Sequence, residues 1–236
     1  MLLAATAASA QENPLWMRYP SISPDGSKIA FAYKGDIFCV DVNGGEARQL
    51  TTNPAYDYKP VWSPDGSKIA FASNREGGFD VYVMDAKGGE PRRLTTNSAG
   101  EIPVTWRDNN HIVFQSSVMP TAESIIFAGN FVEEYVVDLD GHRPTLFSTL
   151  QMDDISINIR GEVLYHDNKG YEDKWRKHHT SPIARDIWLE KDGTFKKLTS
   201  FAGEDRNPVW AADGESYYYL SEQDGTFNIY INKVAG

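Results

Sequence analysis

The sequence has a single cysteine, Cys39, among 236 residues. One cysteine excludes an internal disulfide and any metal or redox motif that needs several cysteines. No apolar run approaches the about 20 residues that cross a bilayer as a helix, so we expect no membrane span. Basic residues are also few, since 23 Lys and Arg stand against 33 Asp and Glu and give a net charge of −10. Because a nucleic-acid binder needs a basic surface, we expect no nucleic-acid partner.

Catalytic and cofactor motifs are missing as well. The sequence has no Gly-x-Ser-x-Gly, no His-Glu-x-x-His, no phosphate-binding Gly-Lys pair and no Gly-x-Gly-x-x-Gly. Of its five histidines only His178 and His179 are adjacent, and neighbours on an extended segment point to opposite sides. The Asp-Gly turns lack the spacing that gathers six or more oxygens around calcium. We therefore expect no catalytic residue, no metal and no cofactor.

Turn formers and aromatic residues are abundant. The chain has 19 Gly and 12 Pro, and 12% of its residues are aromatic. This composition favours many short strands joined by tight turns.

An internal repeat organises the chain. Residues 20–31 read PSISPDGSKIAF and residues 60–71 read PVWSPDGSKIAF, with weaker copies at 103–114, 155–165 and 208–219. Each copy closes on an aromatic residue, and these markers lie 40 to 54 residues apart: Phe31, Phe71, Phe114, Tyr165 and Tyr219. Repeats of this period are typical of propellers and solenoids.

Each copy predicts four strands. The first ends at the Ser-Pro-Asp-Gly turn, and the second carries the marker. The third is an alternating run that ends in a carboxylate or near one, and the fourth closes on Leu-Thr or a relative of it. The third strands each carry an aromatic residue that we expect to pack between neighbouring blades: Phe38, Tyr82, Tyr135, Trp188 and Tyr230. We predict an all-β fold, a β-propeller of four-stranded antiparallel blades, with about five blades present of an expected six. The fifth copy stops after its third strand, so residues 11–236 are expected to form a propeller truncated at its C-terminus.

The first ten residues differ from the rest. They read MLLAATAASA, a short apolar stretch that ends in an Ala-x-Ala pattern. This pattern is typical of a secretory signal peptide. We expect cleavage after Ala10, a mature chain that starts at Gln11, and a periplasmic or secreted protein. The alternative is an Ala-rich start without a targeting role.

The repeat, with its Gly-Gly-Glu-x-x-x-Leu-Thr endings at 44–51 and 88–95, resembles the TolB-like propeller repeat. Blade four narrows the resemblance, because Trp175-Arg176-Lys177-His178 followed by Ile187-Trp188 resembles a segment of the tricorn-like serine peptidases. The match is partial, since His179-Thr180-Ser181 stands where that family often has a basic residue and glycines.

The resemblance implies a non-catalytic N-terminal propeller that serves substrate access, filtering or domain assembly in an exported tricorn-like serine peptidase. The peptidase core would lie beyond residue 236. Its partners would be the downstream peptidase domains of the same chain and peptide substrates, and a homo-oligomer stays open. The alternatives are a TolB-like protein-interaction propeller and the propeller of a prolyl-oligopeptidase-type enzyme.

The blade-four insert is the one segment with distinct chemistry. It gathers cationic and aromatic residues in an acidic chain: Lys174, Trp175, Arg176, Lys177, His178, His179 and Arg185. Such cations can hold a peptide carboxylate or an acidic surface of another domain. The alternative is a solvated loop, partly neutralised by Glu172, Asp173 and Asp186. Because the insert lies outside the strand repeat, we expect the propeller to stay folded when Arg176, Lys177 and Arg185 are changed together to Ala.

Overall fold

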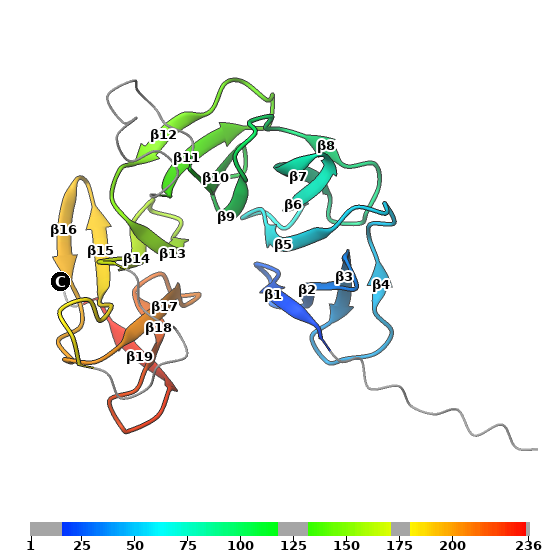
Figure 1. Cartoon of the computed structure of the whole chain (residues 1–236). Helices are drawn as coiled ribbons and strands as arrows, with labels where there is room; N and C mark the ends of the chain where they lie inside the picture. The colour runs from blue at the N-terminus through cyan, green and yellow to red at the C-terminus, as the bar shows by residue number, and fades with distance from the viewer. Residues whose placement is uncertain (1–15, 118–131, 171–179, 235–236) are drawn as a thin grey trace, which may run out of the picture.

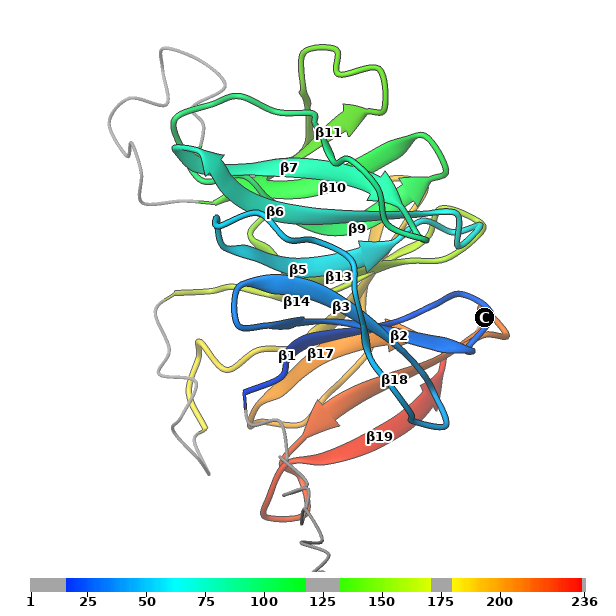
Figure 2. The ribbon, with the colours of Figure 1, turned by 90° about the vertical axis from the view of Figure 1, so that its right-hand side faces the viewer.

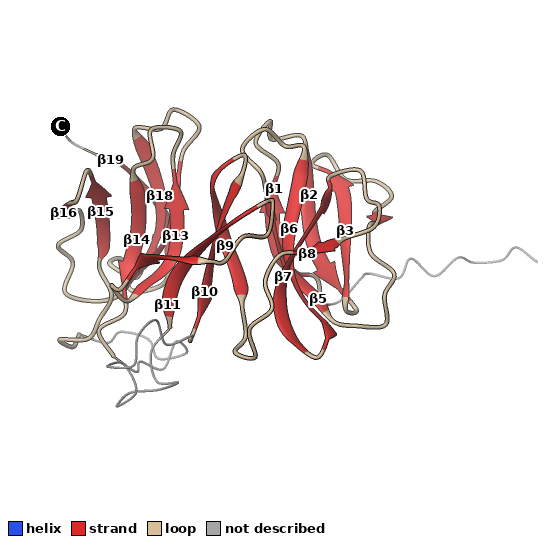
Figure 3. Ribbon diagram, turned by 90° about the horizontal axis from the view of Figure 1, so that it is seen from above, coloured by secondary structure: helices blue, strands red, loops and turns tan. Residues whose placement is uncertain are grey.

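A computed structural model describes residues 16–117, 132–170 and 180–234. These residues form nineteen strands and no helix. The strands make five antiparallel sheets arranged around a central axis (Figure 1). Seen from above, the described chain consists of strands and their connecting loops (Figure 3). The prediction of an all-β propeller is confirmed.

Each sheet is one blade, and its strands follow one another in the sequence. Blades 1 to 4 have four strands, and blade 5 has three among the described residues. Blade 1 is β1 (Arg18–Ile22), β2 (Lys28–Tyr33), β3 (Asp36–Asp41) and β4 (Arg48–Gln49). Blade 2 is β5 (Asp57–Trp62), β6 (Lys68–Glu76), β7 (Gly78–Asp85) and β8 (Arg92–Arg93). Blade 3 is β9 (Ile102–Asp108), β10 (His111–Ser116), β11 (Glu133–Asp138) and β12 (Thr145–Ser148). Blade 4 is β13 (Met152–Ile157), β14 (Val163–Asp167), β15 (Ile187–Lys191) and β16 (Thr194–Lys197). Blade 5 is β17 (Asp205–Trp210), β18 (Ser216–Ser221) and β19 (Asn228–Lys233).

The Ser-Pro-Asp-Gly turns join the first two strands. In blade 2, Gly66 has φ +69° and donates its N–H to the Ser63 carbonyl at 2.8 Å. Asp65 accepts hydrogen bonds from the hydroxyls of Ser63 and Ser67, which lower its pKa to about 2. This turn therefore satisfies its own carboxylate, as the sequence predicted for a turn former.

The core lies between the blades, whose sheets stack face to face (Figure 2). Phe71 is fully buried and stacks on Tyr82, with ring centroids 6.0 Å apart. Both rings pack on Ile37 and Cys39 of blade 1. The opposite face of blade 2 is aliphatic and meets the aromatic face of blade 3. This alternation confirms the prediction that third-strand aromatic residues pack between blades for Tyr82, Tyr135, Trp188 and Tyr230. Phe38 lies instead on the face of blade 1 away from blade 2.

The first strand of each blade lies nearest the axis and carries an irregularity. In four blades one residue there adopts a left-handed backbone conformation: Tyr19 (φ 53°), Lys59 (φ 51°), Asp154 (φ 49°) and Asn207 (φ 55°). Each lies where the register to the second strand shifts. A non-glycine residue in this region costs about 1–3 kcal/mol, and such bulges re-aim side chains. Their side chains line the central cavity described below.

The blades contact one another in sequence order, since β1 packs on β5, β5 on β9, β9 on β13 and β13 on β17. Blades 1 and 5 flank the opening of the ring in Figure 1. The described residues hold five blades, so the count of five is confirmed and the sixth stays a proposal.

Candidate functional site

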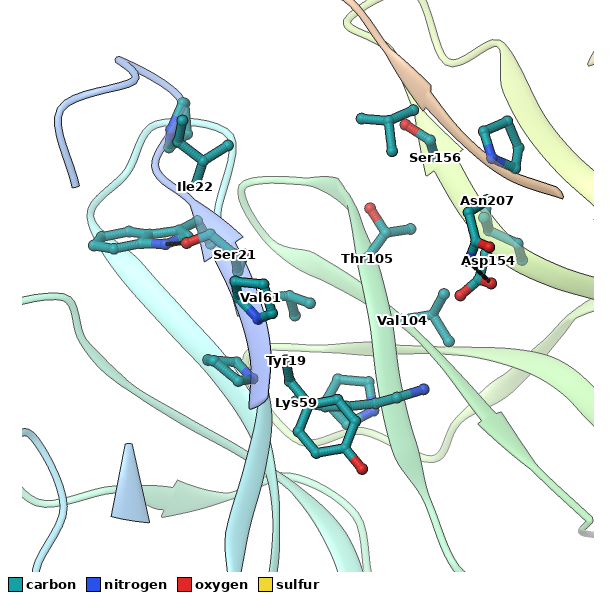
Figure 4. A pocket seen from close by; sticks show the side chains of 18 residues that line it. Tyr19, Ser21, Ile22, Lys59, Val61, Val104, Thr105, Asp154, Ser156 and Asn207 are labelled. Atoms are coloured by element: carbon teal, nitrogen blue, oxygen red, sulfur yellow. Dashed lines mark hydrogen bonds between the residues drawn. The ribbon is translucent and has the colours of Figure 1, made fainter. Parts of the chain in front are cut away.

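A cavity of about 520 Å³ occupies the axis of the ring. The first strands of all five blades line it, so residues far apart in the sequence meet there. Figure 4 shows Tyr19 and Lys59 on one side of this cavity, and Asp154 with Asn207 on the other.

One end of the cavity opens into a second space of about 420 Å³, which we call the polar mouth. Val104 is its single aliphatic residue. The polar lining residues are Lys59, Gln115, Asp153, Asp154, His166, Arg185, Arg206 and Asn207. Arg185 lies just before β15, and the others lie near the starts of first strands and the ends of second strands. The polar mouth therefore opens on the end of the propeller that carries the loops between second and third strands.

Lys59 and Asp154 carry opposite charges into this space. Lys59 makes no ion pair with the described residues, although its charge acts on Asp154. Asp154 accepts a hydrogen bond from the Asn207 amide. Its side chain is about half exposed to the cavity, but the surrounding protein partly desolvates it and raises its pKa. The polar mouth thus has three cationic side chains against two carboxylates, in a chain of net charge −10.

His166 forms the floor of the polar mouth. It is 4% exposed, and burial together with Arg185 and Arg206 lowers its pKa to about 3. Its Nδ1 accepts the N–H of Asn207 at 3.2 Å, so the proton of the neutral ring lies on Nε2. The imidazole is therefore a neutral structural group near neutral pH.

Arg185 is the one predicted binding residue that the structure describes. Its guanidinium lies 2.6 Å from the Glu204 carboxylate, and its side chain is only 13% exposed. It lines the polar mouth, which places the end of the blade-four insert at the cavity. Because Arg185 pairs with the buried Glu204, its removal is expected to cost stability, although the insert lies outside the strand repeat.

The other candidates of the insert lie outside the described residues. They are Lys174, Trp175, Arg176, Lys177, His178 and His179. Both ends of this segment, Gly170 and Thr180, are described. These two residues lie on the connection between β14 and β15.

Tyr19, which lines the cavity, belongs to a cluster of aromatic rings from blades 1 and 2. Tyr58 lies between Tyr19 and Phe79, with ring centroids 5.4 Å and 5.0 Å away, and Tyr56 is 5.6 Å from it. Burial raises the pKa of Tyr58 to about 12. One ring of this cluster, Tyr19, therefore lines the cavity on the same side as Lys59.

A second group of titratable residues lies on an exposed turn. Ligand atoms of Asp138, Asp140 and His142 all lie within 4.8 Å of one another. His142 Nδ1 is 2.6 Å from an Asp138 carboxylate oxygen, so these two side chains already satisfy each other. Nothing further in the described residues marks this turn as a ligand site.

Comparison with known families identifies the fold more narrowly. The sequence profile of the tricorn protease N-terminal beta propeller domain matches residues 14–236. The chain belongs to this family. The family is defined by a propeller domain and not by a catalytic core. A search of curated protein sequences finds no match.

Solved structures agree on the fold. TolB from Agrobacterium tumefaciens superposes with a TM-score of 0.72 at 17% identity, over 93% of this chain and 77% of that one. Tricorn protease gives 0.72 at 22% identity, over 92% of this chain and 21% of that one. A puromycin-hydrolyzing peptidase from Mycobacterium tuberculosis gives 0.63 at 14% identity, over 93% and 36%. The TM-scores show that the three structures share the fold of this chain. Among the described residues no helix could cross a membrane.

Proposed function

We propose that this chain is the non-catalytic propeller of an exported tricorn-like serine peptidase, and that its polar mouth admits and orients peptides by their carboxylate groups. The peptidase core would be supplied by other domains of the same protein. The family match and the tricorn protease structure support this proposal over the alternatives.

The observation that carries the proposal is the unpaired Lys59 ammonium inside a cavity. A lysine that only served stability would pair with a carboxylate or extend into solvent. Lys59 instead occupies a strained backbone position that aims it at the axis, across from Asp154. Arg206 lines the same space and stacks its guanidinium 4.2 Å from the Phe227 ring centre. An incoming carboxylate would find charge-assisted donors there.

The sixth blade belongs to the same proposal. At each described junction an aromatic face meets an aliphatic one. Blade 5 presents exposed aliphatic residues on the face away from blade 4, with Ile229 75% and Ile231 60% exposed. Blade 1 carries the stacked pair Phe31 and Phe38 on the face away from blade 2. One further blade would cover both faces.

TolB-like protein interaction is the second candidate function, favoured by the fold match to TolB. In that case the polar mouth would bind a protein surface without recognising the C-terminal carboxylate of a peptide. Export after cleavage at Ala10 is common to both candidates, and those residues lie outside the described part of the chain. N-terminal sequencing of the protein secreted from its native gene would show whether the mature chain starts at Gln11.

Fluorescent peptides with a free C-terminal carboxylate, compared with their C-terminal amides, test the proposal. We expect the free acids to bind more tightly at low salt. Lys59→Gln should weaken their binding at least about tenfold, since a hydrogen bond to a charged group contributes about 1.5 kcal/mol or more. Lys87→Gln is the matched control, because Lys87 lies in the exposed turn after β7, at the other end of blade 2. Equal binding of acid and amide would favour the TolB-like alternative.

A further inference from the structure

The junctions between blades share a pair of acids. One acid lies at or near the start of the third strand of a blade, and the other lies at or near the start of the first strand of the next blade. In each pair burial raises the pKa of one acid, and the charge of the other acid adds to this rise. The pairs are Asp36 with Asp57, Asp80 with Glu101, Glu134 with Asp153, and Asp186 with Asp205.

Three of the four junctions hold a cation on these acids. The contacts are Arg75 to Asp57 (2.9 Å), Arg93 to Asp80 (2.9 Å), Lys169 to Asp186 (2.6 Å) and Lys197 to Asp186 (2.8 Å). Buried carboxylates are stable only when such partners offset their lost hydration. The cation is therefore a regular part of the junction.

The junction between blades 3 and 4 differs, because a neutral amide stands near its acids. The Gln115 amide nitrogen lies 3.0 Å from the Met152 carbonyl, and 3.4 Å from one oxygen each of Glu134 and Asp153. An amide has only two hydrogens for these three acceptors, and two of the distances are long. Among the described residues no lysine or arginine pairs with Glu134 or Asp153.

Glu134 is a buried carboxylate without a cationic partner among the described residues. It is fully buried, and its Oε2 has no hydrogen-bond partner. Burial, with Asp153 and Glu133 as the charged groups around it, raises its pKa to about 8. Nearby, His166 is neutral and lies 3.8 Å from Asp153. Oxygen atoms of Glu134, Asp153 and Met152 therefore surround the Gln115 amide. This junction lacks the lysine or arginine that the other three junctions have among the described residues.

We propose that this junction binds a calcium ion through Glu134, Asp153, the Met152 carbonyl and Gln115. Rotation of the Gln115 amide would present its oxygen in place of its nitrogen, since the two ends have the same shape. The donors are then all oxygens, and two carboxylates balance the ion's charge. Ca²⁺ accepts six to eight oxygens in flexible geometry, whereas Mg²⁺ demands a tight octahedron. Gln115 and Asp153 line the polar mouth, which can supply the remaining ligands as water.

Thermal melting of the chelator-treated chain, titrated with Ca²⁺, tests the site, with Mg²⁺ and Na⁺ at equal ionic strength as comparisons. Ca²⁺ at a hundredfold excess over its Kd should raise Tm by about 5 °C or more. The rise should be larger at pH 9 than at pH 6, because Ca²⁺ competes with the proton on Glu134. Calorimetry should give one ion per chain.

Three variants locate the ion. Glu134→Gln should abolish the Ca²⁺ response, while Glu133→Gln, the same change one residue away, should keep it. Gln115→Lys places an ammonium among the oxygens, as Lys169 does in blade 4. It should raise Tm without Ca²⁺ and remove the response to the ion.

Three results would overturn the proposal. One is a Tm that follows pH alone and ignores Ca²⁺, which would make the proton the sole occupant. Another is an equal Ca²⁺ response in wild type and Glu134→Gln, which would assign the ion to exposed acids such as the Asp138 turn. The third is an unchanged Ca²⁺ response in Gln115→Lys.

Discussion

Blades 1 and 2 differ from blades 3 and 4 in the partners that their acidic side chains have. In the first pair the repeat is nearly identical, the turns satisfy their own carboxylates, and Arg75 neutralises Asp57 at the junction. In the second pair the repeat is worn, Glu134 has no cation, and His166 is buried neutral between two aspartates. The polar mouth takes most of its lining from blades 3 to 5. Residues that recur in the repeat therefore stabilise the propeller. Positions where the sequence departs from the repeat are candidates for a binding role.

The largest effect should come from the cation of the regular junction. Arg75→Ala leaves Asp57 buried and unpaired, so we expect a loss of about 3–5 kcal/mol in the free energy of unfolding. Gln115→Ala at the irregular junction should cost about 1 kcal/mol, since it removes only neutral donors. Urea unfolding of both variants in chelator measures the difference. Equal losses would show that the two junctions do not differ as described.

Glu134→Gln should reveal the uncompensated acid through its pH dependence in chelator. The folded protein holds the Glu134 proton up to a pKa of about 8, whereas the unfolded chain releases it near its ordinary pKa of about 4.3. Wild type therefore loses stability relative to the variant as pH rises between these values, by up to about 1.4 kcal/mol per pH unit, and no further above pH 8. Urea melts from pH 5 to 9 measure this. A difference in the free energy of unfolding between wild type and variant that stays constant from pH 5 to 9 would contradict the raised pKa of Glu134.

His166→Gln should act on the acid side with the opposite trend. The folded-state pKa of His166 falls to about 3, so the unfolded chain takes up a proton first as pH drops below about 6.5. Wild type then loses stability relative to the variant as pH falls towards 4.

The exposed His142 is the control for His166, because Asp138 raises its pKa. His142 therefore contributes stability at low pH that is lost as pH rises, and His142→Gln should give a small change of the reverse sign. The same direction in both histidine variants would contradict the assignment of His166 as a buried neutral ring.

The fold could be predicted from the sequence because its signals are local. The turn residues, the closing aromatic residue and the Leu-Thr endings all recur within each copy. The structure explains the last of these, since the hydroxyls of Thr51, Thr95 and Thr199 each accept the N–H that follows a junction acid. A residue that has the same structural role in each blade recurs in the sequence at the period of the repeat.

The polar mouth could not be predicted in the same way. Lys59, Asp154 and Asn207 come from three blades, so no local pattern brings them together. Asn and Asp favour a left-handed backbone more than other non-glycine residues do, but lysine does not indicate it. One signal was available, because the residue before the first-strand proline lies at the axis in Tyr19-Pro20, Lys59-Pro60 and Asn207-Pro208. Of the candidates in the blade-four insert, only Arg185 is described, and it lines the polar mouth. Its partner Glu204 lies on the connection between β16 and β17, in no sequence motif that would have predicted the pair.

The most direct test of the central claim measures binding and cleavage on one sample. The purified chain is mixed with a peptide pool, bound peptides are quantified, and mass spectrometry follows cleavage over a day. We predict binding that needs a free carboxylate and Lys59, with every peptide intact, because the described residues bring no nucleophile and base together. Reproducible cleavage that a substitution in this chain abolishes, or binding indifferent to both the carboxylate and Lys59, would contradict the account.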